Sequence, residues 1–282
     1  MSEKILNDFK IFLLSDDKSK NTIKSYLYNI NIFFRWYQKT YQENFNELKK
    51  EHVTNFKSYL ANDLNRNAKT INHYLITLKY FNSFLLEQNY QPNFVITNKM
   101  NIKIQTQFAS PTNIHKEDID LFEEKIINSG NLRNVLLINI LKYTGLRISE
   151  ALNIRYTDFN LDTRECVIRS GKGGKQRTVF FNEKVLNILE KYLKTNKKNS
   201  IYLFSSNKSD KLNRTVVNRI FQKYSNNTIT PHDLRHFFCT NALEKGFGIH
   251  EVANIAGHSN IQTTLLYTNP TKKKIQNKME LL

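Results

Sequence analysis

Apolar residues recur every three or four positions through the first ninety residues, and this period limits the possible folds more than any other feature. The longest stripes run from Ile23 to Tyr37 and from Ile71 to Leu85, with shorter ones at 5–13 and 53–60. A helix with this period buries one face against its neighbours. Aromatic residues fill much of each stripe, and at such positions they normally form core. We therefore predict a domain of four packed helices over residues 1–92.

Helical periodicity is lost after residue 92 and returns beyond residue 112. The intervening segment is polar and carries Pro111, with Pro92 just before it, so we interpret 93–112 as an extended linker. Further helical patterns lie at residues 119–126, 135–143, 148–154, 183–195, 213–225, 232–246, 248–256, 260–268 and 271–282.

The period changes once, within the second half of the chain. Residues 165–169 and 176–181 are rich in β-branched and aromatic side chains, and a Gly-Lys-Gly-Gly run separates them. Two such segments around a glycine-rich turn predict a β-hairpin. The fold class is thus mostly α-helical with a small β-hairpin or sheet. It comprises the N-terminal four-helix domain and an α+β domain over 113–282.

The chain carries a net charge of +17, spread over both halves. Basic residues exceed acidic ones by six in residues 1–110 and by eleven in residues 111–282. A strongly basic folded protein usually has a polyanionic partner, although charge also keeps proteins soluble. Excess charge in both halves suits two domains that close on a duplex from two sides.

Membrane and secretory signals are missing from the sequence. No apolar run is long enough to span a bilayer, and the N-terminus has no charged-then-apolar secretory pattern. Cys166 and Cys239 are isolated and lack metal-site spacing, which suits buried thiols in a reducing compartment. We expect a cytoplasmic protein with no membrane partner.

Six residues in separate segments could together act on a phosphodiester. Each has an ordinary alternative when taken alone: Lys172 could be a hairpin tip, Arg147 an ion-pair partner of Glu150, and Tyr267 a core aromatic. His232 and Arg235, however, lie three apart at a helix start that Thr230 and Pro231 mark, so they share a face. The six candidates are Arg147, Lys172, His232, Arg235, His258 and Tyr267.

Phosphoryl transfer to tyrosine has three requirements, and these residue types meet them. Arginines neutralise the non-bridging oxygens by bidentate donation. The tyrosine must lose a proton although its ordinary pKa is about 10. The leaving 5′ oxygen must gain a proton from an acid such as lysine or histidine. No metal or cofactor is needed for any of these steps.

Two other chemistries have weaker support. The spacing of His232 and His236 can chelate zinc, but no His-Glu-x-x-His motif or nearby thiol accompanies them. The Gly171-Lys-Gly-Gly run lies inside a predicted hairpin, whereas a phosphate-cradling nucleotide loop joins a strand to a helix. We predict neither a metal site nor nucleotide hydrolysis.

The motifs around these residues resemble those of the tyrosine recombinase (phage integrase-like) family. The resemblance covers most of residues 112–270, and the order and spacing of the motifs match. The N-terminal helices resemble, less specifically, the family's SAM-like core-DNA-binding domain. The matching motifs are Thr-Gly-Leu-Arg147-Ile-Ser-Glu150, Gly-Lys172-Gly, His232-Asp-Leu-Arg235-His and Gly-His258-Ser followed by Tyr267.

The resemblance implies a role for each matched residue. Arg147, Arg235 and His258 would bind the scissile phosphate, while Lys172 would protonate the 5′ oxygen. His232 would assist proton transfer, and Glu150 would orient its neighbours. Tyr267 would form a 3′-phosphotyrosine intermediate.

The length of the chain is similar to that of the family's two-domain group, which includes Xer-type resolvases and transposon-encoded cointegrate resolvases. Such proteins act as tetramers on two paired double-stranded DNA sites in bacteria. The resemblance thus implies a nucleoid-associated recombinase that resolves replicon dimers or transposon cointegrates, with a second recombinase or an accessory protein as possible partners. A C-terminal helix over 271–282 would link subunits in trans, or pack in cis. Other hypotheses are an integrase or excisionase of a mobile element, a type IB topoisomerase-like enzyme and a protein that only binds DNA.

Overall fold

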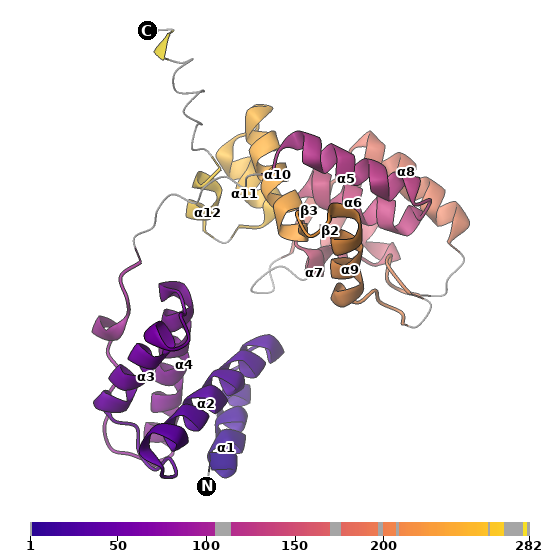
Figure 1. Ribbon diagram of the computed structural model, residues 1–282. Coiled ribbons are helices and arrows are strands. Elements are labelled where there is room, and N and C mark those ends of the chain that lie inside the picture. Colours follow the sequence, from indigo (N-terminus) through magenta and orange to yellow (C-terminus); the bar gives the residue numbers. More distant parts are fainter. Residues whose placement is uncertain are drawn as a thin grey trace. The chain divides into compact units, whose positions relative to one another are not determined.

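The computed structural model describes residues 2–104, 114–169, 176–196, 200–206, 209–258, 260–267 and 279–280. The chain divides into two compact units, Met1–Thr106 and Gln107–Leu282. Both are mainly helical, and the second contains the strands (Figure 1). The predicted fold class is confirmed.

Four helices build the first unit, as the apolar stripes predict. They are α1 (Ser2–Ser15), α2 (Lys20–Tyr41), α3 (Lys50–Asn62) and α4 (Ala68–Glu87). Ser19 and Asn67 begin α2 and α4, where their side chains accept hydrogen bonds from the backbone N–H groups of Thr22 and Thr70. Such caps satisfy donors that the first helical turn leaves free.

Aromatic rings fill the core of the first unit. The Phe33 ring meets the rings of Phe45 and Phe56 edge-on, with centroids 5.9 and 5.2 Å apart. Phe9 and Phe81 make a similar contact at 5.2 Å. All five rings are buried, so the aromatic stripes form core as expected.

The segment after α4 packs onto the same core as far as residue 104. Ile96 is buried, and the Asn82 side chain accepts a hydrogen bond from the Val95 N–H at 2.8 Å. The Asn72 side chain likewise accepts from the Ile102 N–H and donates to the Ile102 carbonyl, both at 2.8 Å. A short 3₁₀ helix, η1 (Asn98–Met100), lies between these contacts.

The second unit is organised around a helix that is buried on all sides. This helix, α6, carries fully buried residues from Leu136 to Leu141, and α5 and α8 pack against it. The elements of this unit are α5 (Lys116–Asn128), α6 (Leu132–Thr144), α7 (Ile148–Ala151), η2 (Tyr156–Asp158), β1 (Phe159–Asn160), β2 (Glu165–Ile168), β3 (Arg177–Phe180), α8 (Glu183–Thr195), α9 (Arg214–Ser225), α10 (Pro231–Glu244), α11 (Ile249–Ala256) and α12 (Gln262–Leu265).

The predicted hairpin is part of a three-stranded antiparallel sheet in the order β1-β2-β3. In the register, Cys166 faces Val179, and Phe159 on β1 faces Cys166 from the other side. Strand β1 was not predicted, because a strand of two residues is too short to display an alternating pattern. Cys166 and Cys239 are buried thiols, as predicted.

The last helices gather on one side of the second unit, where α10, α11 and α12 lie close together (Figure 1). Two predicted helices are shorter than expected: α7 ends at Ala151, and α12 covers only Gln262–Leu265. The helix predicted at 271–282 lies outside the described residues, apart from 279–280.

Candidate active site

The site begins where α6 ends. Gly145 follows α6 with φ +62°, a left-handed conformation, and its N–H donates to the Leu141 carbonyl. A Cβ at Gly145 would lie 2.3 Å from the Phe238 ring, so both conformation and space require glycine here. This tight turn places Arg147 directly before α7.

Arg147 and Glu150 form one unit at the start of α7. The Glu150 carboxylate accepts from the Arg147 backbone N–H at 2.8 Å and from its Nη1 at 2.9 Å. Burial alone would raise the pKa of Glu150, but the hydrogen bonds from Arg177 and Arg147 outweigh it and lower that pKa. The ion pair that the sequence offered as an alternative for Arg147 therefore exists, and it orients the guanidinium.

Arg235 enters the site from α10. The Thr230 side chain caps this helix and Pro231 occupies its first turn, as predicted. Arg235 is 4% exposed, and its Nη1 donates at 2.7 Å to the carbonyls of both Gly145 and Ala256. Burial, followed by the charge of Arg147, lowers the pKa of Arg235 to about 10, so it is still protonated at neutral pH.

His258 follows the left-handed Gly257 (φ +71°) at the end of α11. The His258 Nδ1 lies 2.7 Å from the hydroxyl oxygen of Thr264, which is itself buried. Burial, followed by the charges of Arg235 and Arg147, lowers the pKa of His258 to about 4. The imidazole is therefore neutral at pH 7.

Tyr267 lies beside these groups, just after α12. Its ring is nearly parallel to that of His258, at 5° and a centroid separation of 6.2 Å, and lies 5.1 Å from the His236 ring. Burial raises the pKa of the Tyr267 hydroxyl well above its ordinary value, whereas the charge of Arg235 lowers it. The ring is only partly buried, so Tyr267 is not a sealed core residue.

His232 and His236 form a pair on α10. Their Nε2 atoms lie 2.8 Å apart, so one ring donates a hydrogen bond to the other. Burial lowers the pKa of His232, as do the charges of Arg235 and Arg147. His236 thus connects His232 to the Tyr267 ring. The sequence analysis had weighed His236 only as a metal ligand.

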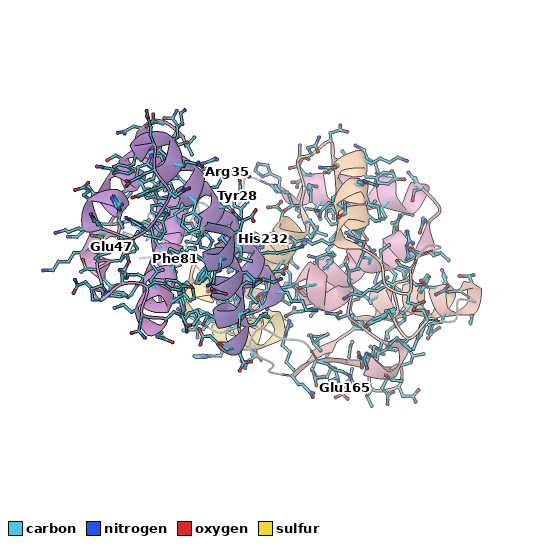
Figure 2. All side chains as sticks on the ribbon, turned by 90° about the horizontal axis from the view of Figure 1, so that it is seen from below. Tyr28, Arg35, Glu47, Phe81, Glu165 and His232 are labelled. Carbon is cyan, nitrogen blue, oxygen red and sulfur yellow. The ribbon has the colours of Figure 1, made fainter. Side chains whose placement is uncertain are left out.

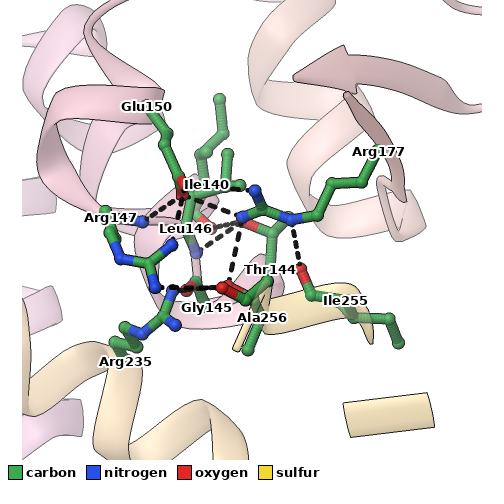
Figure 3. Close-up of polar contacts among 11 residues, drawn as sticks. Ile140, Thr144, Gly145, Leu146, Arg147, Glu150, Arg177, Arg235, Ile255 and Ala256 are labelled. Carbon is green, nitrogen blue, oxygen red and sulfur yellow. Dashed lines mark hydrogen bonds and ion pairs between the residues drawn. The ribbon is translucent and has the colours of Figure 1, made fainter. Parts of the chain in front are cut away.

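Arg177 is a member of this cluster that the sequence analysis missed (Figure 3). It begins β3, and its guanidinium lies across the Glu150 carboxylate from Arg147. One signal was available: Arg177 and Val179 lie two apart in a strand and so share a face, and Val179 is fully buried. An arginine on the inward face of a short strand needs buried partners.

Five of the six candidate residues therefore come together from four helices and their ends: Arg147, His232, Arg235, His258 and Tyr267. The sixth, Lys172, lies outside the described residues. Within the described ranges no group of three or more His, Cys, Asp or Glu side chains could hold a metal ion. No helix among the described residues is long and apolar enough to cross a membrane.

The assembled groups can bind an anion next to a phenol. The two arginines repel each other and depress the pKa values of the neighbouring histidines, and a bound phosphodiester would relieve this repulsion. Glu150 forms an ion pair with both Arg147 and Arg177, so one carboxylate is shared by two guanidinium groups. The cluster is thus cationic, with a partly buried tyrosine at its side.

The first unit exposes a separate basic face. Helix α2 contains no acidic residue, and Lys24, Tyr28, Asn31 and Arg35 form one exposed stripe along it, which we call the α2 stripe. Tyr28 and Arg35 point away from the core in which Phe81 lies (Figure 2). Basic and polar groups on one helix face are typical of a surface that binds nucleic acid.

Comparison with known proteins agrees with this arrangement. A model of the phage integrase family matches residues 113–274, and one of the phage integrase N-terminal SAM-like domain matches residues 5–92. The TnP I resolvase of Bacillus thuringiensis is 50% identical over 99% of both chains. The tyrosine recombinase XerA of Pyrococcus horikoshii is 32% identical over 98% of this chain and 92% of its own.

Solved structures of low sequence identity share the fold. The XerH site-specific recombinase bound to a palindromic difH substrate has a TM-score of 0.74 at 24% identity, over 91% of this chain and 78% of its own. The Tn1549 transposon integrase in complex with transposon right end DNA has a TM-score of 0.75 at 19% identity, over 98% of both chains.

Proposed function

We propose, since this chain belongs to the phage integrase family and is a tyrosine site-specific recombinase, that Tyr267 attacks a DNA phosphate held by Arg147 and Arg235. One observation carries the proposal. Both guanidinia bind neighbouring carbonyls at the end of α11, Gly257 for Arg147 and Ala256 for Arg235, and Tyr267 lies beside them. His258 completes the phosphate pocket.

The reaction exchanges one ester for another. The Tyr267 oxygen bonds to phosphorus, the bond from phosphorus to the 5′ oxygen breaks, and a 3′-phosphotyrosine remains. The phenolic proton passes to His232, which the lowered pKa keeps neutral at pH 7. Lys172 protonates the departing 5′ oxygen. A 5′ hydroxyl from a second duplex then reverses the step, so the bond energy is retained and no cofactor is consumed.

The biological role that we favour is resolution. The 50% identity with a resolvase over nearly the whole chain supports a recombinase that separates joined replicons, either dimers or transposon cointegrates. We further propose that four copies assemble on two paired DNA sites in the bacterial cytoplasm, at the nucleoid. In this assembly residues 271–282 link neighbouring subunits, because Ile275, Met279 and Leu282 lie at helical spacing.

A nicked suicide duplex tests the proposed nucleophile. A nick close to the cleavage point lets the short 5′ end diffuse away, so the covalent protein–DNA adduct accumulates. We would incubate the protein with a pool of such duplexes made from non-coding DNA next to its gene, and sequence the DNA trapped on denaturing gels. Adduct with the wild-type protein and none with Tyr267→Phe is the expected result. Equal adduct with Tyr267→Phe would refute the assignment.

The α2 stripe is expected to bind DNA without taking part in cleavage. Replacing Lys24 and Arg35 together by alanine removes two positive charges, so the slope of log affinity against log salt should fall by about 2. The matched control replaces Lys4 and Lys10, two exposed lysines of α1, and should change the slope less. Filter binding across a salt series measures both. An equal change in the two double variants would contradict this assignment.

A further inference from the structure

Arg177 is a residue of this cluster to which the proposed reaction gives no role. Its Nη1 and Nη2 donate to the two Glu150 oxygens at 3.1 and 2.8 Å, and its Nε donates to the Ile255 carbonyl at 2.9 Å. We propose that Arg177 is a positioning residue, which holds Glu150 and the end of α11 so that Arg147 and Arg235 face the phosphate. The inference rests on the proposed function of those two arginines.

The Glu150 carboxylate is buried, at 3% exposure. Each of its oxygens accepts one bond from Arg147 and one from Arg177. A carboxylate held from one side only can rotate about its last side-chain bond. Because Arg177 occupies the opposite side, the carboxylate is fixed, and so is the Arg147 guanidinium that it orients (Figure 3).

Arg177 also binds the end of α11. Three successive carbonyls there each accept from an arginine: Ile255 and Ala256 from Arg177, Ala256 also from Arg235, and Gly257 from Arg147. The C-terminal end of a helix is its negative end, which favours such cations. Arg177 thus shares the Ala256 carbonyl with Arg235 and the Glu150 carboxylate with Arg147. A shift of the Arg177 guanidinium would therefore displace the side chains of both other arginines.

The Arg177 guanidinium lies close to the backbone just before His258. A Cβ built on Gly257 would lie 2.6 Å from the Arg177 Cζ, so the backbone lies directly against the guanidinium. The position of Arg177 therefore limits the turn that presents His258. Only a planar fork of donors reaches Glu150 and two carbonyls at once, and a lysine ammonium cannot do so.

Arg177 also pairs with Ile168 in the register of β2 and β3, and it comes five residues after Lys172 in the sequence. A second route would therefore run through Lys172, the acid proposed to protonate the leaving group. The described contacts of the Arg177 guanidinium all go to Glu150 and the end of α11. They favour an effect on the phosphate pocket, and chemically altered substrates separate the two routes.

The test is single-turnover cleavage by Arg177→Lys on three nicked duplexes. One has the natural phosphate, one a sulfur in place of the bridging 5′ oxygen, and one an uncharged methylphosphonate. Sulfur leaves without a proton donor, and the methylphosphonate needs less cationic stabilisation. The matched control is Arg169→Lys, since Arg169 lies at the end of the same hairpin and pairs with the buried Asp158.

We expect Arg177→Lys to cleave the natural substrate about 100-fold more slowly at saturating protein, as for a misplacement of about 1 Å. The deficit should persist with bridging sulfur and shrink at least tenfold with the methylphosphonate, while Arg169→Lys changes little. Any of three results overturns the inference. These are cleavage of the natural substrate by Arg177→Lys at the wild-type rate, full recovery of its rate with the bridging sulfur, and a deficit that is as large with the methylphosphonate as with the natural phosphate. Arg177→Gln, which keeps two donors, is measured in the same way if the lysine variant does not fold. Failure of the wild-type protein to form a Tyr267 adduct would instead refute the proposed function.

Discussion

Gly257 offers a test of the packing at the site, because a substitution there has two energetic costs that can be measured separately. One is backbone strain, and the other is a clash with the Arg177 side chain. Gly257→Ala places a Cβ at φ +71°, a left-handed conformation that costs an ordinary residue about 1–2 kcal/mol. The same Cβ would lie 2.6 Å from the Arg177 Cζ. The guanidinium ends a flexible side chain, but Glu150 and two backbone carbonyls hold it, so it cannot move without losing those bonds.

The matched control is Gly130→Ala, which has nearly the same conformation (φ +68°) but nothing within 4 Å of the added Cβ. Gly130→Ala should therefore cost only the backbone term of about 1–2 kcal/mol. Gly257→Ala adds the loss of hydrogen bonds between charged groups, about 1.5–3 kcal/mol, for a total near 4 kcal/mol. At about 2–4 °C per kcal/mol for a domain of this size, the expected falls in Tm are about 12 °C and about 4 °C.

Calorimetry of the full chain measures the Tm of each variant. The suicide duplex measures cleavage by the folded protein at 20 °C. Gly257→Ala should also slow cleavage about 100-fold, since displaced Arg177 no longer fixes Glu150. Gly130→Ala should cleave at the wild-type rate. If the two variants have the same Tm and the same cleavage rate, the Arg177 side chain moves aside at no cost and the packing argument is wrong.

Two further predictions concern stability. His236 and His258 have pKa values lowered from 6.5 to about 4, so the stability from their neutral forms is fully present above pH 6.5 and is lost as the pH falls towards 4. The free energy of unfolding in urea should be about 1 kcal/mol lower per histidine at pH 5 than at pH 7, after allowing for partial exposure. A His236→Gln, His258→Gln variant should show a smaller fall, to which His232 with its lowered pKa still contributes; an equal fall in that variant would assign the effect to other groups. Lys142→Ala should cost about 3 kcal/mol in urea unfolding, because the buried Glu123 loses a partner at 2.6 Å. Lys184→Ala, which removes the half-exposed partner of the same carboxylate, should cost less than about 1 kcal/mol, and equal costs would contradict the burial argument.

Most elements of the fold could be predicted from local patterns. The stripe from Ile23 to Tyr37 requires a buried helix face, and α2 buries it. The change of period at 165–181 gave the hairpin, because alternation is visible over four residues or more. Strand β1 could not be predicted, since its two residues gain their conformation from pairing with β2.

The candidate site was partly visible for the same reason. Arg147 and Arg235 stand in short motifs whose neighbours reveal their setting, namely the glycine turn before Arg147 and the capped helix start before Arg235. Tyr267 was identified only by its position after the Gly-His258-Ser motif. Arg177 has no such motif. Its partner carbonyl on Ile255 is 78 residues away, and nothing in the local sequence indicates that pairing.

The amino-acid sequence alone determined which segments become helices and which residue types could act on a phosphate, because these depend on side-chain chemistry and on spacing within one element. The tertiary structure decided which charges meet. Three arginines at the end of one helix are stable only where Glu150 and the carbonyls of α11 converge on them, and packing between segments far apart in the chain creates that arrangement.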